Sequence, residues 1–186
     1  MKKTNKTFKR FAAITSASLL AACAMAPVFT SMTSYAASIT IEGISSQKHQ
    51  FKVYQIFKGE ITQQTVGTGD TATTVDILSN LKWGSGVSKY KANSTADAVP
   101  VTVDTDVPET FSNSLTSMNA RDVVELLEFN ETEEIHESNG TSLTISNLAD
   151  GYYYIEDVSD FSNADESNSA WIVQVAKDAT IAIKNA

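Results

Sequence analysis

Residues 143–157 read LTISNLADGYYYIED, two runs of strand-forming residues on either side of a short turn. The first run alternates apolar and polar residues, and the second concentrates tyrosine and isoleucine, which favour strands. The turn carries Asp150 and Gly151, residues typical of tight connections. We therefore predict two strands, over 142–145 and 151–157.

The rest of the chain extends this β pattern in both directions. Alternating or β-branched runs predict further strands at 38–42, 51–57, 75–81, 99–103, 170–175 and 180–184. The polar stretches 63–74 and 83–113 are expected to be loops, the second one on the surface and holding the strand at 99–103. We predict a mainly-β sandwich that carries one helical insertion.

That helical insertion is predicted over residues 119–129. Ala120, Val123, Val124 and Leu127 follow the spacing of one helix face, and Ser117 or Asn119 is a suitable cap.

The first 36 residues have the layout of a secretory signal peptide. Five basic residues precede an uncharged apolar run from 11 to 28, and small residues at Ser34 and Ala36 suit cleavage after Ala36. We predict a leader over 1–36 and one domain over 37–186, with membrane contact only through the leader before cleavage. An alternative is lipidation of Cys23, because residues 20–23 read LAAC and resemble a bacterial lipobox.

The predicted mature domain is acidic and contains no thiol. Once the five basic residues of the leader are removed, nine basic residues face 22 acidic ones, a formal charge of −13. Such a surface repels phosphate backbones and anionic lipids, which argues against nucleic-acid binding and peripheral membrane docking. Cys23 is the only cysteine, so the domain cannot form a disulfide.

The stretch 143–157 resembles the B-type repeat of collagen-adhesin surface proteins, which also occurs in sortase-assembled pilins of Gram-positive bacteria. YQIFKG at 54–59 and LKWGSGV at 81–87 look like the N-terminal domain of major pilins. The resemblance implies an immunoglobulin-like β-sandwich, secretion, and covalent polymerisation by a pilin sortase. It also implies self-formed Lys-to-Asn isopeptide bonds. The chain has no Leu-Pro-x-Thr-Gly motif, so we expect either a fragment of a longer pilin or a subunit that is not itself anchored by a sortase.

Asp157 is the candidate acid for an internal isopeptide bond. It shares strand parity with Tyr153 and Ile155, so we expect all three to face the core. A carboxyl in an apolar interior stays protonated more readily and can polarise an Asn carboxamide. The remaining candidates for that bond are two lysines as nucleophile and one asparagine as carboxamide: Lys52, Lys58 and Asn185. The alternative is that these residues only begin a turn, end a strand or belong to a frayed terminus.

Lys184 is the candidate for the link between subunits. Its parity is opposite to that of Ile181 and Ile183, which points its amine to solvent at the end of the last strand. The resemblance implies an acceptor lysine near this position. The alternative is an ordinary solvated lysine.

No other pattern predicts catalysis, a metal site or a cofactor. Tyr152, Tyr153 and Tyr154 are expected to pack on both faces of a strand, with a ligand platform as the alternative. The acidic groups that are candidates for Ca²⁺, Asp104 with Asp106 and residues 131–134, lack calcium-loop spacing. His49 and His136 stand alone in the sequence, and no motif of a hydrolase or transferase is present.

The expected function is therefore that of a non-enzymatic structural subunit, or N-terminal domain, of a cell-wall-attached pilus. Its expected partners are other pilin subunits and a pilin sortase. The alternatives are a monomeric adhesin, which would hold a host ligand through the loop at 83–113, and a cell-envelope lipoprotein.

Overall fold

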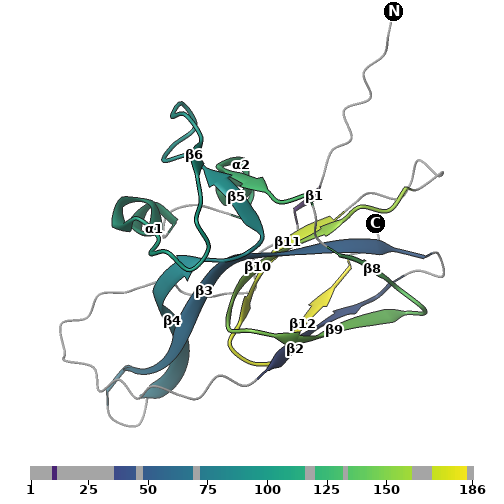
Figure 1. Ribbon diagram of the computed structural model, residues 1–186. Helices are drawn as coiled ribbons and strands as arrows, with labels where there is room; N and C mark the ends of the chain where they lie inside the picture. The colour runs from purple at the N-terminus through teal and green to yellow at the C-terminus, as the bar shows by residue number, and fades with distance from the viewer. Residues whose placement is uncertain are drawn as a thin grey trace, which may run out of the picture.

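The computed structural model describes residues 10–11, 36–44, 48–68, 72–115, 120–131, 134–160 and 169–183. This part of the chain is mainly β and forms three sheets with two short helices (Figure 1). The predicted leader over 1–36 lies almost entirely outside the described residues. Among the described residues, no helix combines the length and apolar character needed to cross a membrane.

The central sheet is the largest of the three. Its strands are, in spatial order, β1 (Arg10–Phe11), β11 (Ser169–Val175), β10 (Gly151–Asp157), β3 (Gln50–Val66) and β4 (Thr73–Trp83), and β8 (Ile135–Glu137) also pairs with β3. Strand β10 is antiparallel to both of its neighbours. The motif strand of the sequence thus lies inside the sheet.

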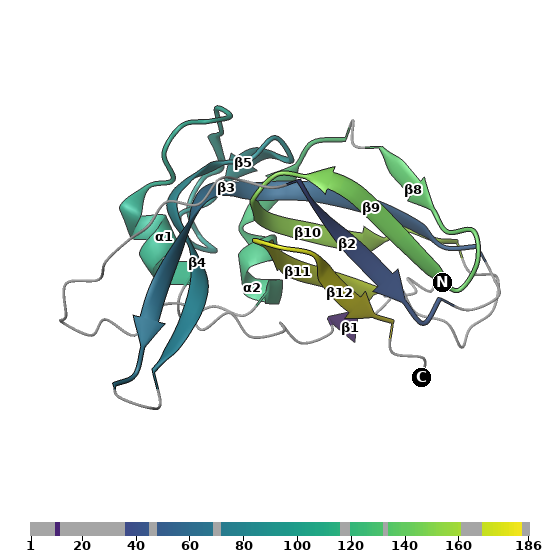
Figure 2. The same ribbon diagram turned by 90° about the horizontal axis from the view of Figure 1, so that it is seen from below.

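Two smaller sheets cover the central one. The first covering sheet consists of β12 (Ala179–Ala182), β2 (Ala37–Glu42) and β9 (Ser142–Leu148). The second covering sheet consists of β6 (Val99–Pro100), β5 (Val87–Tyr90) and β7 (Leu127–Phe129), and lies near the helices α1 (Glu109–Leu115) and α2 (Ala120–Glu125). Figure 2 shows the first covering sheet over β10 and β11, with α1 and β5 grouped toward the other end of the molecule.

Along β10, β11 and the first half of β3, both faces of the central sheet are largely buried, which creates two hydrophobic cores. The first core lies against the first covering sheet and includes Ile39, Phe51 and Ile155, each with no exposed surface. The second core joins Tyr54, Trp83 and Phe111 to the second covering sheet. A strand buried on both faces needs apolar side chains at consecutive positions, which explains the dense aromatic composition of β3 and β10.

Gly84 and Gly151, from the motifs at 81–87 and 143–157, lie where the backbone of β3 comes too close for a side chain. A Cβ on Gly151 would lie 2.2 Å from the carbonyl oxygen of Phe57, and one on Gly84 would lie 2.2 Å from that of Gln55. Real Cβ atoms do not come this close to backbone oxygen, so a larger residue would force the strands apart. The motif glycines therefore let β10 and the segment after β4 pack tightly against β3.

Several predicted elements differ from the structure. A turn or loop is expected over 63–74, but residues 63–66 and 73–74 are strand, because β3 continues to Val66 and β4 begins at Thr73 in a long hairpin. The surface loop expected at 83–113 contains β5, β6 and α1, and it buries Val87 and Phe111 in the second core. Repeated β-branched residues support the hairpin, and Pro108 allows α1 to start at the next residue.

The single helix expected over 119–129 is shorter in the structure. Helix α2 ends at Glu125, and residues 127–129 instead form β7, which pairs with β5. Val123 and Leu127 are both buried, as the helical spacing predicted, but Leu127 reaches the core from a strand. Pairing with β5 overrides the helical preference of this segment.

Candidate functional site

Asp157 lies at the end of β10 and faces the first core. The alternation of strand side chains predicted that Tyr153, Ile155 and Asp157 share one face, and all three are buried, at 5%, 0% and 1% exposure. A carboxyl group at this depth requires polar partners, because an unpaired buried charge is strongly unfavourable.

His49 supplies one of these partners. Its Nδ1 lies 2.8 Å from Oδ2 of Asp157, and only 5% of the histidine is exposed. The imidazole also stacks on Phe51, with ring centroids 5.9 Å apart and an interplanar angle of 11°. In the pairing of β3 with β10, Phe51 is the backbone partner of Asp157. His49 precedes Phe51 by two residues and therefore lies beside the end of β10.

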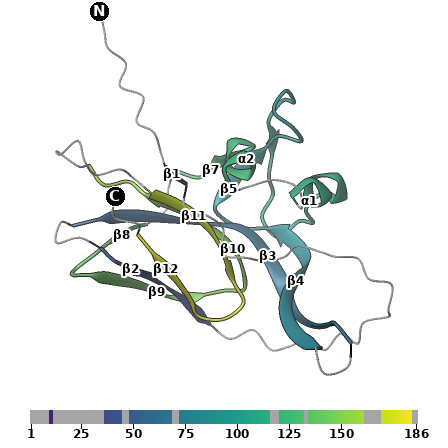
Figure 3. The ribbon, with the colours of Figure 1, turned by 180° about the vertical axis from the view of Figure 1, so that it is seen from behind.

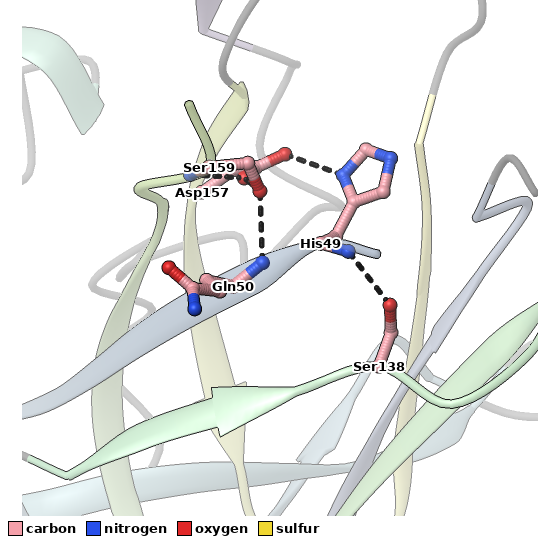
Figure 4. A network of polar contacts seen from close by, with 5 residues as sticks. All are labelled: His49, Gln50, Ser138, Asp157 and Ser159. Atoms are coloured by element: carbon pink, nitrogen blue, oxygen red, sulfur yellow. Dashed lines mark hydrogen bonds and ion pairs between the residues drawn. The ribbon is translucent and has the colours of Figure 1, made fainter. Parts of the chain in front are cut away.

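Ser159 completes the contacts of the carboxylate, as Figure 4 shows. Both the backbone N–H and the hydroxyl of Ser159 donate to Oδ1 of Asp157, the former at 3.0 Å. The same hydroxyl oxygen accepts the backbone N–H of Gln50 at 2.8 Å. Oδ1 and Oδ2 together accept three hydrogen bonds, a strong arrangement for a buried carboxylate.

Ser138 extends the cluster to a third chain segment. Its hydroxyl accepts the backbone N–H of His49 at 2.8 Å, and its own backbone N–H donates to the carbonyl of His49 at 2.9 Å. The cluster of His49, Gln50, Ser138, Asp157 and Ser159, the polar clasp, therefore joins the start of β3, the chain after β8 and the end of β10. These are the places where the ladders of the central sheet stop.

The polar clasp contains serine, histidine and aspartate but not the geometry of a catalytic triad. In a triad, the serine hydroxyl gives its proton to histidine, and the carboxylate orients the far side of the imidazole. Here the hydroxyl of Ser159 donates to the carboxylate of Asp157, whereas the serine of a triad donates to histidine. These hydrogen bonds fasten chain segments to one another.

The two candidate lysines do not face Asp157. Lys52 pairs in register with Glu156, so by strand alternation it lies on the opposite face of the sheet. Lys58 pairs in register with Gly151, at the other end of β10, and its Nζ bonds to Oδ1 of Asp104 at 2.7 Å. The structure brings together Asp157 and His49, a pair that the sequence analysis did not connect.

The other predicted site residues divide between described and undescribed parts of the chain. Ala36, the predicted cleavage residue, is exposed and directly precedes β2. Cys23, Lys184 and Asn185 lie outside the described residues. The isopeptide bond, the lipidation and the subunit link therefore stay predictions.

The acidic residues weighed for Ca²⁺ do not converge in the described part of the chain. There, no group of three or more His, Cys, Asp or Glu side chains is arranged to hold a metal ion. Asp104 bonds instead to Lys58, and His136 lies on β8 opposite Phe51.

The three consecutive tyrosines pack on both faces of β10. Tyr153 lies in the first core, Tyr154 lies in the second, and Tyr152 packs against the second. The hydroxyl of Tyr153 donates to the carbonyl of Ala149 at 2.9 Å and accepts from Gln55 at 3.0 Å. Burial raises the pKa of Tyr153 and of Tyr154 to about 12 each, and it also raises the pKa of Tyr152.

These pKa shifts predict a loss of stability in strong base. Between pH 10 and about 12 the unfolded chain loses its tyrosine protons first, while the folded chain keeps them. The free energy of unfolding should therefore be independent of these groups below pH 10 and fall as the pH rises above it. Urea unfolding at several pH values measures this slope. Tyr153→Phe should make the slope shallower, and an unchanged slope would contradict the assignment to Tyr153.

Comparison with protein-family models, with curated proteins and with solved structures finds no match to this chain.

Proposed function

We propose that this chain is a structural subunit, or the N-terminal domain of one, in a cell-surface pilus. The proposal follows the leader and the pilin-like motifs of the sequence. In it, the domain is a secreted immunoglobulin-like sandwich that a pilin sortase joins to other subunits through a lysine. It is not an enzyme, it uses no cofactor, and its acidic surface does not bind nucleic acid.

The observation that carries this proposal is the parallel pairing of β2 with β12. Ala179 pairs with Ile39, and Ala182 pairs with Glu42, so β2 starts and β12 ends at opposite ends of the same sheet. A force that pulls these two strands apart along their axes loads their hydrogen bonds together, in shear. Lys184 follows β12 by two residues, so a covalent link at Lys184 would transmit tension along this strand.

The polar clasp supports a mechanical role in the same way. Its hydrogen bonds hold together the start of β3, the end of β10 and the chain after β8. In a domain without cysteine after the leader, such contacts take the place that disulfides hold in many secreted proteins.

The subunit link is tested by replacing Lys184 with alanine. Cells that produce the natural chain should show a ladder of covalent polymers that survives boiling in detergent. Lys184→Ala should reduce the ladder to a single band, because it removes the amine that forms the intersubunit amide bond. Immunoblotting measures both. Lys177→Ala, at an exposed lysine between β11 and β12, is the matched control and should keep the ladder. Polymers that persist in Lys184→Ala would exclude this lysine.

A monomeric adhesin is the second candidate, and one surface feature favours it. An open hollow of about 460 Å³ lies beside the β3–β4 hairpin and α1, and its lining includes Glu60, Lys82, Asp106 and Glu109. Part of this lining comes from the loop at 83–113 that the sequence analysis assigned to ligand binding. An adhesin gives one band on producing cells and saturable binding of a ligand, in contrast to the covalent ladder of a pilin.

Mass spectrometry of the mature chain separates the remaining alternatives. A free N-terminus at Ala37 supports cleavage after Ala36, whereas a lipidated Cys23 identifies an envelope lipoprotein. An internal Lys–Asn isopeptide bond expels ammonia and lowers the intact mass by about 17 Da.

A further inference from the structure

The β3–β4 hairpin extends beyond the rest of the central sheet as a two-stranded ribbon. Strand β10 pairs with β3 no further than Lys58, whereas β4 follows β3 as far as Val66. Figure 3 shows this hairpin running away from the layered part of the molecule. Residues 60–66 and 73–79, the ribbon, have no third strand among the described residues. A two-stranded ribbon alone is only marginally stable in water, so a further strand would stabilise it.

Along the outer edge of β4, backbone N–H and C=O groups are placed to pair with a further strand. Backbone hydrogen bonds join Leu81 and Trp83 to the segment 104–107, so these two residues direct backbone groups away from β3. Between Ser79 and Lys82 the register shifts by one residue, which resets the alternation. Thr74, Asp76 and Leu78 therefore direct their N–H and C=O groups outward, in the spacing that an antiparallel strand requires.

The ribbon has little of the usual protection of an edge strand. Natural edges are blocked by charged side chains, proline or a bulge. Between Thr73 and Ser79 there is no proline or lysine, the register shift comes only after Ser79, and Asp76 is the one charged residue. Its exposed valines, Val66 and Val75, are 48% and 36% exposed. Since Gln64 pairs with Val75 and Val66 with Thr73, the two valines lie on the same face of the ribbon.

The low charge of the ribbon makes it a place where a second copy of the chain can approach. The whole chain carries a formal charge of −8, so two copies repel each other over most of their surface and can meet only where charge is sparse. The ribbon holds only two charged residues, Glu60 and Asp76, and the carboxylate of Asp76 accepts a hydrogen bond from Gln63 at 3.2 Å. An antiparallel edge is also complementary to itself across a two-fold axis.

We propose that two copies of this chain pair through the outer edges of their β4 strands, antiparallel, with the two-fold axis at Val75. This register sets Val75 opposite its own copy in a non-hydrogen-bonded pair, where side chains are closest. It also sets Thr74 opposite Asp76 of the second copy. An axis at Asp76 would instead place two carboxylates directly opposite each other, which is destabilising. This inference does not depend on pilus assembly, and it adds lateral contact between copies.

Sedimentation of the purified chain over a hundredfold range of concentration tests the pairing. The natural chain should dimerise with rising concentration, whereas Val75→Lys and Val75→Glu should each weaken the dimer by at least about tenfold. An equal mixture of the two variants should dimerise again, because lysine then faces glutamate across the axis. Val99→Lys, at a valine 46% exposed on β6, is the control and should behave like the natural chain.

The outcomes of this experiment separate the pairing from its alternatives. A natural chain that stays monomeric overturns the proposal. The partner of the ribbon would then be a different protein. Dimers that survive in Val75→Lys, or that Val99→Lys weakens equally, also overturn it. A mixture of the two charge variants that stays monomeric contradicts the register at Val75. Circular dichroism confirms that each variant is folded.

Discussion

Asp157→Ala is expected to lower the free energy of unfolding by about 3–5 kcal/mol, the usual cost of breaking a buried ion pair or its hydrogen-bonded equivalent. The substitution removes the acceptor for His49 Nδ1 and for both donors of Ser159. These donors lie where little water reaches, since Ser159 is 6% exposed. Urea unfolding followed by circular dichroism measures the change.

Glu128→Ala is the matched control for the loss of a carboxylate. Glu128 also contacts a basic side chain, Lys89, but its own side chain is 46% exposed. Surface pairs of this kind contribute less than about 1 kcal/mol. If the two alanine variants lost the same small stability, the polar clasp would not hold the strand ends as described.

Phe111→Ala is the second substitution with a large expected effect, a loss of about 3–5 kcal/mol. Phe111 is 1% exposed, and its ring centroid lies 5.2 Å from that of Tyr90 and 5.6 Å from that of Trp83. Truncation leaves a cavity in the second core, between α1 and the central sheet. Thermal and urea unfolding measure the loss.

Ser112→Ala is the control within the same helix. Ser112 is only partly buried, and its hydroxyl bonds to the carbonyl of Glu109 within the first turn. We expect a change within about 0.5 kcal/mol. If Phe111→Ala left the free energy of unfolding nearly unchanged, α1 would not cover a second core. The layered description of the fold would then be wrong.

The strands around the first core could be predicted from the sequence because local pattern and burial agree there. The strand at 151–157 has the predicted bounds, and those at 37–42 and 169–175 each begin one residue earlier than predicted. In each, alternation or β-branched composition reflects the faces that the fold buries.

The long hairpin and the second core could not be predicted in the same way. The ribbon is rich in threonine and glutamine, and its strands depend on pairing with each other more than on burial. Helix α1 has only seven residues, too few for a periodic pattern to be recognised. Residues 127–129 follow the helical spacing but pair with β5, a contact that only the tertiary fold provides.

The polar clasp illustrates what sequence spacing leaves out. His49 and Asp157 are 108 residues apart, and only the register of β3 and β10 joins them. One signal was present, since His49 shares parity with Phe51 and Val53 and so faces the core with them. A histidine on an apolar face requires a polar partner, and Asp157 was already expected on that same face.

The proposal that this domain is a covalently joined unit of a fibre can be tested on detergent-resistant material from producing cells, by tryptic digestion and tandem mass spectrometry. We expect a branched peptide in which the Nζ of Lys184 forms an amide with the C-terminal residue of another chain. Trypsin should fail to cleave after that lysine. Recovery of Lys184 and every other lysine of the chain only in linear peptides would contradict the proposed covalent assembly.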